Sequence, residues 1–205
     1  MVWFLGCSHN TSTSPSYKLI NRYKSVLQSS IRHGKIYKGL ETLLLADIVY
    51  CSPQYQKAYR DVYFQNHNLS TPLEREEFDR ENLTGDRYRF LVAVFSDHET
   101  WHELTTDNLG KGSIWTLSLI NQAGETLKPL SITELDDISE YVKSSSQIHS
   151  PWRKYYEIDF LKKIPGRGLS FVNGPSFTLK ISSLYGFMEF SWSEETDGKK
   201  EQKKI

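Results

Sequence analysis

The stretch from Arg87 to Leu119 decides the fold of this chain, and it reads RYRFLVAVFSDHETWHELTTDNLGKGSIWTLSL. It begins with a run from Tyr88 to Phe95 that is apolar at nearly every position. Such a run predicts a strand buried on both faces, in the centre of a sheet. From Ile114 to Ile120 apolar and polar residues alternate instead, which predicts a strand with one buried face. The stretch therefore predicts a β-rich domain built around Tyr88–Phe95.

Further strands are expected on both sides of this stretch. Before it, Lys35–Tyr50 is rich in Ile, Tyr, Leu and Val and predicts one long strand. After it, Glu125–Ile132 returns from a turn at 121–124 and predicts a hairpin. The remaining strands are expected at Trp152–Leu161, Phe177–Ile181 and Phe187–Trp192. Together they predict an α+β fold based on an antiparallel β-sandwich of about six or seven strands, of immunoglobulin-like size.

Helices are expected at the N-terminus and in an insertion between strands. Apolar residues at helical spacing from Tyr17 to Ile31 predict an amphipathic helix that Gly34 ends. Ser52-Pro53 and Thr71-Pro72 each place a capping hydroxyl before a proline at the first helical position. They predict a two-helix insertion at about residues 52–86. The first of these helices carries a tyrosine-rich stripe that is expected to face the core.

Composition limits the classes of function. A chain of 205 residues fits one domain, expected here over residues 17–193, and the apolar-poor tail at 194–205 is expected to be disordered. Lys plus Arg equal Asp plus Glu at 25 each, so we expect no nucleic-acid partner. The two cysteines, Cys7 and Cys51, are too few for a disulfide framework. Cys51 is expected to be buried and inert, although a bridge to Cys7 stays open.

The N-terminus resembles the end of a lipoprotein signal peptide. Met1–Cys7 reads MVWFLGC, and a Ser/Thr/Asn-rich linker follows up to residue 16. This pattern predicts lipid attachment at Cys7, because a tethered domain needs a flexible polar spacer. Only six residues precede Cys7 and none of them is basic, so either translation starts upstream of Met1 or the match is accidental.

His98-Glu99-Thr100-Trp101-His102 has the letters of a zinc hydrolase. In that class two histidines one helical turn apart bind zinc, and the glutamate is the general base. The surrounding residues favour a structural interpretation, because Ser96 and Glu99 form a capping box that predicts a short exposed helix at 97–104. Candidates for a third zinc ligand are Glu125, Glu134 and His149.

Several short motifs in the chain are similar to those of an uncharacterised family of lipoproteins from Gram-negative bacteria. The motifs are Cys7, Tyr50-Cys51-Ser52-Pro53-Gln54-Tyr55, Phe95, Trp101, Pro129, Trp152 with Tyr155, and Gly186 with Trp192. The resemblance implies an exported, lipid-anchored protein without known activity. It also implies that Trp101 is a packing residue. In that family no pair of histidines is required at this place, so the resemblance does not favour His98 and His102 as metal ligands.

We therefore expect a lipid-anchored protein of the cell envelope, without enzymatic activity or a cofactor, that binds another envelope protein or supports an assembly. Ser8 after Cys7 lacks the aspartate type of inner-membrane retention signal, so the expected location is the periplasmic face of the outer membrane. The alternatives are a zinc-dependent hydrolase that uses His98, His102 and Glu99, and a carrier for an apolar ligand, suggested by the 13% aromatic content.

Overall fold

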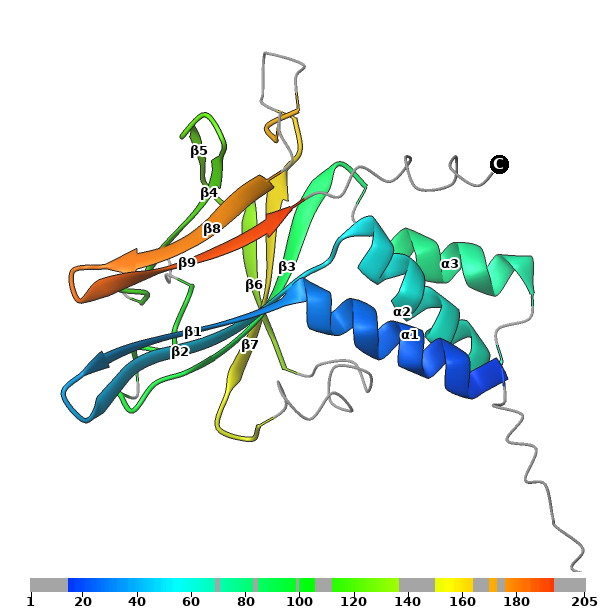
Figure 1. Ribbon diagram of the computed structural model, residues 1–205, viewed down its shortest axis with the longest axis horizontal. Helices are drawn as coiled ribbons and strands as arrows, with labels where there is room; N and C mark the ends of the chain where they lie inside the picture. Colours follow the sequence, from blue (N-terminus) through cyan, green and yellow to red (C-terminus); the bar gives the residue numbers. More distant parts are fainter. Residues whose placement is uncertain are drawn as a thin grey trace, which may run out of the picture.

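The computed structural model describes residues 15–68, 71–82, 85–98, 100–105, 112–136, 150–163, 170–172 and 176–193. In these residues, three helices and nine strands form three layers (Figure 1). A five-stranded antiparallel sheet lies in the middle, between the helices on one face and a four-stranded antiparallel sheet on the other. The predicted α+β fold with a β-sandwich is confirmed, with more strands than expected.

The order of strands within each sheet places the predicted central strand. The five-stranded sheet contains, from edge to edge, β1 (Ile31–Lys38), β2 (Glu41–Tyr50), β3 (Arg87–Phe95), β7 (Lys154–Leu161) and β6 (Ser131–Leu135). The four-stranded sheet contains β5 (Thr126–Leu127), β4 (Thr116–Asn121), β8 (Ser176–Ser183) and β9 (Gly186–Ser193). The apolar run therefore forms β3, the middle strand of the larger sheet, as its sequence predicts.

Aromatic side chains from both sheets fill the space between them. Phe177 of β8 contacts the ring of Tyr50 on β2 and that of Phe90 on β3, with centroids 5.0 and 6.2 Å apart. Trp192 of β9 lies 5.4 Å from Phe90 and donates a hydrogen bond from Nε1 to the Ser30 carbonyl at 2.8 Å. This filled interior gives no support to the apolar-ligand carrier that the aromatic content suggested.

The helices begin where the capping signals predict. They are α1 (Pro15–Ser30), α2 (Pro53–Asn66) and α3 (Pro72–Asn82). Ser52 Oγ accepts the Tyr55 backbone N–H of α2 at 3.1 Å, and Thr71 Oγ1 accepts the Glu74 N–H of α3 at 3.3 Å. The tyrosine-rich stripe of α2 packs with α1 against the outer face of the five-stranded sheet, so its predicted core role is confirmed.

The long strand predicted at Lys35–Tyr50 is wrong, because the chain reverses within it. Gly39, with φ +64°, makes the turn between β1 and β2, a conformation that costs glycine little. Gly34 does not end a helix but lies inside β1. A Cβ built there would lie 2.5 Å from Phe190 Cζ, so glycine lets β1 approach β9 closely. At the same seam Arg32 Nε donates to the Ser191 carbonyl at 3.0 Å.

The strand predicted at Glu125–Ile132 is also wrong as one element. Its first part is β5, which pairs with β4, whereas its end belongs to β6, which pairs with β7 in the other sheet. The chain changes sheets at Lys128-Pro129, where proline has no backbone N–H to donate to a ladder. Leu130 then donates to the Asp159 carbonyl at 2.7 Å and begins the new pairing.

Some predictions concern residues outside the described part of the chain. Cys7 and most of its linker lie in residues 1–14, and the charged tail lies in residues 194–205. In the part of the chain that is described, none of the helices combines the length and the apolar content that crossing a bilayer requires.

Candidate functional site

The segment that follows β3 forms turns, and the short helix predicted at 97–104 is wrong for its described residues. Ser96 Oγ accepts a hydrogen bond from the His98 N–H at 3.1 Å. The predicted capping box would instead have Ser96 accept the N–H of the third residue along, Glu99. Asp97 makes two hydrogen bonds with the backbone of Thr42. The Asp97 N–H donates to the Thr42 carbonyl at 3.0 Å, and the Thr42 N–H donates to the Asp97 carboxylate at 2.7 Å. These bonds to the start of β2 extend the β2–β3 pairing beyond Phe95, so the chain cannot turn directly into a helix.

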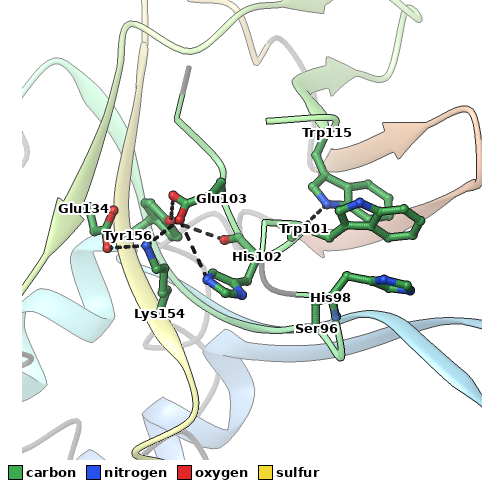
Figure 2. Close-up of polar contacts among 9 residues, drawn as sticks. All are labelled: Ser96, His98, Trp101, His102, Glu103, Trp115, Glu134, Lys154 and Tyr156. Atoms are coloured by element: carbon green, nitrogen blue, oxygen red, sulfur yellow. Dashed lines mark hydrogen bonds and ion pairs between the residues drawn. The ribbon is translucent and has the colours of Figure 1, made fainter. Parts of the chain in front are cut away.

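His98 and His102 point away from each other (Figure 2). The His98 ring stacks on Trp101 with centroids 4.1 Å apart, and its Nε2 lies 3.8 Å from Glu41 Oε2. His102 Nε2 lies 3.8 Å from Glu103 Oε1. A helical turn would place both rings on one face, whereas these turns separate them.

The other candidates for a zinc site do not converge on either histidine. Glu134 pairs with Lys154 at 3.0 Å, and Glu125 accepts a hydrogen bond from Asn121 at 2.8 Å. Glu99 and His149 lie outside the described residues. Within the residues that are described, no three His, Cys, Asp or Glu side chains gather in a way that could hold a metal. The geometry therefore gives the zinc-hydrolase hypothesis no support.

A partly exposed polar cluster fixes the 100–105 segment to the large sheet (Figure 2). Lys154 Nζ lies 2.6 Å from Glu103 Oε1 and 3.0 Å from Glu134 Oε1. The Tyr156 hydroxyl donates to the His102 carbonyl at 3.2 Å. Burial raises the pKa of Tyr156 far above its usual value. Partial burial alone would lower the pKa of Lys154, but its hydrogen bonds and ion pairs with Glu103 and Glu134 raise that pKa above its usual value. Both groups thus stay protonated near neutral pH, which suits anchoring better than proton transfer.

Trp101 joins this segment to the second sheet. Its ring stacks on Tyr185 with centroids 4.6 Å apart, on the side of the β8–β9 hairpin. Its carbonyl accepts a hydrogen bond from Trp115 Nε1 at 2.6 Å, and its side chain packs against the core between the sheets. The packing role that the resemblance implies for Trp101 is confirmed.

The same stack links the tips of two hairpins that carry exposed apolar side chains. The β1–β2 and β8–β9 hairpins project to the same side, away from the helices (Figure 1). Leu40 and Leu184 at their turns have relative exposures of 102% and 103%. We use the name hairpin-tip surface for the exposed apolar residues of the two hairpins, which are Tyr37, Leu40, Leu184, Tyr185 and Phe187. His98, beside Glu41, and Trp101, beside Tyr185, connect its two halves.

Sequence reasoning missed this surface, although a signal for it exists. Turns are normally polar, yet Leu40 follows Gly39, and Leu184-Tyr185 precedes Gly186 at the second turn. An apolar residue beside a turn glycine has no core to enter, so it indicates exposure. The proximity of the two turns could not be read from the sequence, because it depends on how β1 packs against β9.

Cys51 has no features of a reactive cysteine. It is free and buried between the sheet and the helices, as predicted. Burial raises the pKa of its thiol to about 12, so the thiolate needed for nucleophilic attack is not populated near neutral pH.

Comparison with known proteins adds one distant structural neighbour. No family model matches the sequence, and no curated protein matches it. A crystal structure of a "novel protein of unknown function" from Burkholderia pseudomallei K96243 is similar, with 8% identity over 86% of this chain and 84% of that one, at a TM-score of 0.42. A similarity this weak carries no functional argument, and the lipoprotein resemblance stays a prediction.

Proposed function

We propose that the chain is a non-enzymatic envelope protein, tethered through a lipid on Cys7, that binds another protein with its hairpin-tip surface. The observation that carries the proposal is that two separate hairpins, which project to the same side of the molecule, have fully exposed leucines at their turns and exposed aromatic residues beside them. Exposed apolar side chains at neighbouring turns mark interaction sites on protein surfaces.

The composition of the surface favours a protein partner over a lipid surface. Tyrosine and tryptophan are enriched at the centres of protein interfaces, and a mixed polar rim usually surrounds them. Here Lys35 lies over the Tyr37 ring at 5.6 Å, and the Lys180–Glu189 ion pair at 2.9 Å flanks Phe187. Glu41 adds another negative charge beside Leu40. Charges of both signs suit a protein rim, whereas an anionic membrane favours a surplus of basic residues.

The surface is also held in shape before binding. The His98–Trp101–Tyr185 stack and the Asp97–Thr42 hydrogen bonds connect the two hairpins through one segment. Fixing these side chains in advance lowers the entropy that a partner must remove on binding.

The position of the tether leaves this surface free. In Figure 1 α1 begins on the side of the helices, and the hairpin tips lie on the opposite side. If Cys7 carries the lipid, residues 8–14 span at most about 25 Å before Pro15. The hairpin-tip surface would then point away from the bilayer, toward a periplasmic partner.

Site-specific photo-crosslinking in intact cells tests the proposal. A photoreactive phenylalanine analogue at Leu184 is expected to give an adduct with another protein, and the same analogue at Leu73, an exposed residue of α3, is expected to give none. Cys7→Ser is expected to move the chain from the membrane fraction to the soluble fraction. Adducts from both positions or from neither, or an adduct only with a second copy of this chain, would overturn the binding proposal. Unchanged partitioning of Cys7→Ser would overturn the tether.

A further inference from the structure

A polar cavity lies where the strands end on the side opposite the hairpin tips. Its volume is about 670 Å³, within the range of ligand sites. The ends of four neighbouring strands contribute to its lining, with Arg32 from β1, Tyr50 from β2, Tyr88 from β3 and Lys162 directly after β7. The end of β9 in the other sheet also lines it, so the cavity lies at one end of the space between the sheets.

The strand register shows that these four residues form a diagonal row. In β2, Tyr50 lies two residues beyond the partner of Arg32. The same step of two residues leads from the partner of Tyr50 to Tyr88 in β3, and from the partner of Tyr88 to Lys162 after β7. Each step is about 8 Å, because it combines one strand spacing of about 4.8 Å with two residues of about 3.3 Å each. The cavity is therefore a groove, with about 24 Å between the Cα atoms of Arg32 and Lys162, too long for one small ligand to reach both ends.

Each end of the groove carries a cation that has no acidic partner. Arg32 donates from Nη1 to the carbonyls of Ser29 and Ile31 at 2.8 and 2.7 Å. Lys162 donates to the Gly85 carbonyl at 3.0 Å. These carbonyls orient the two cations, but within the described residues neither cation forms an ion pair, and no carboxylate lines the groove. Arg32 Nη2 and part of the Lys162 ammonium are left without a described partner, so each cation can still bind a carboxylate.

The rest of the lining offers hydrogen-bonding groups that suit a peptide backbone. Such a backbone carries one donor and one acceptor at nearly every residue. Ser29 and Ser30 donate their hydroxyl hydrogens to the Val26 carbonyl at 2.8 and 2.9 Å, so their lone pairs can still accept N–H groups. The side chains of Gln54 and Ser193 make no hydrogen bond with any described residue, so both can donate and accept.

We propose that this groove binds an extended acidic segment of another protein. One carboxylate of the segment pairs with Arg32, and another, about six residues along, pairs with Lys162. Six residues of an extended chain cover about 20 Å, and the charged side chains cover the remaining few ångströms of the row. Because side chains of an extended chain alternate in direction, both carboxylates then point to the same side.

The lining favours a protein segment over a glycan. Aromatic residues recognise sugars by stacking, which requires an exposed ring face. The aromatic residues of the groove, Tyr50, Tyr88 and Trp192, are only 5%, 2% and 4% exposed, so they offer almost no such face. A peptide needs hydrogen-bonding groups and charges at a fixed spacing, which the groove has. This site lies apart from the hairpin-tip surface and does not depend on it.

Fluorescence anisotropy with a labelled peptide and the full chain tests this inference. The probe has seven residues, with a glutamate at each end and five serines between them, and the control peptide has glutamine at each end. We expect each terminal glutamate to strengthen binding about tenfold, because each adds a hydrogen bond between charged groups. A third peptide carries both glutamates side by side in its middle and is expected to bind at least about tenfold more weakly than the probe. Equal binding of the probe and this third peptide would overturn the groove.

Lys162→Gln is expected to bind the probe about tenfold more weakly than wild type, because one terminal glutamate loses its partner. Lys163→Gln is the matched control, since Lys163 is the next residue, does not line the groove and pairs with Asp86 at 3.8 Å. Its affinity is expected to equal that of wild type. Arg32→Gln is expected to act like Lys162→Gln where circular dichroism shows that it folds. Equal weakening in the variants of Lys162 and Lys163 would contradict the proposal, as would no binding of the probe at millimolar concentration or tighter binding of a uronic-acid oligosaccharide.

Discussion

Replacing Arg89 by methionine is expected to lower the free energy of unfolding by about 3–5 kcal/mol, because it removes the bidentate partner of a buried carboxylate and leaves only the half-exposed Arg87 beside it. Asp159 is 2% exposed and lies directly opposite Arg89 in the β3–β7 ladder. Arg89 donates to both of its oxygens, from Nε at 2.9 Å and from Nη2 at 3.0 Å. This bidentate pair lies on the face of the sheet that the helices cover, away from bulk solvent.

Arg87→Met is the matched control. Arg87 donates to the same carboxylate at 3.0 Å, but its side chain is 47% exposed, so water can replace it. Its loss is expected to cost no more than about 1 kcal/mol, as for other exposed ion pairs. Urea unfolding of the two variants measures the difference. Equal losses in both variants would show that Arg89 contributes no more than an exposed arginine.

The effect of Arg89→Met is expected to depend on pH. Burial alone would raise the pKa of Asp159, but the hydrogen bonds from Arg89 and Arg87 hold it below its ordinary value of 3.8. A carboxylate whose pKa is lower in the folded state stabilises the fold above its unfolded pKa, and this contribution is lost as the pH falls through the folded value. The difference between wild type and Arg89→Met should therefore be full near neutral pH and shrink as the pH falls below 3.8.

Replacing Phe177 by alanine is expected to cost about 3–5 kcal/mol, because it empties the centre of the contact between the sheets. Phe177 is 2% exposed and contacts four aromatic rings, three on the opposite sheet and one, Trp192, on the neighbouring strand β9. Its neighbours come from β2, β3 and β9, so no single strand can move to fill the space. The cost includes both the lost burial of the ring and the cavity that remains.

Phe187→Ala on the neighbouring strand is the control. Phe187 is 61% exposed, so its removal is expected to change the free energy of unfolding by no more than about 0.5 kcal/mol. Chemical denaturation of both variants gives the comparison. A loss at Phe177 as small as that at Phe187 would mean that the two sheets do not share the core described here.

Local signals explain which elements could be predicted from the sequence. Ser52-Pro53 and Thr71-Pro72 satisfy helix N-termini with atoms close in the chain, so α2 and α3 were predicted correctly. The apolar run Phe90–Phe95 of β3 likewise indicates burial on both faces, whatever its neighbours are.

The errors arise where a distant partner decides the local structure. Asp97 is held by Thr42, a residue 55 positions earlier, and this contact replaces the predicted helix with turns. Gly34 looks like a helix end but is required by Phe190, far along the chain. The candidate sites are non-local in the same way, because the cavity combines residues from Ser29 to Ser193. Spacing along the chain cannot bring such residues together.

The size of the native complex in mild detergent extracts of membranes decides whether the hairpin-tip surface binds a protein. Leu184→Asp puts a charge at the centre of the surface, whereas Leu73→Asp puts the same charge on α3, where the leucine is 71% exposed. We expect wild type and Leu73→Asp to sediment in one larger complex and Leu184→Asp to sediment as the free chain, with all three equally stable. Complexes of equal size for both variants would contradict binding at the hairpin tips.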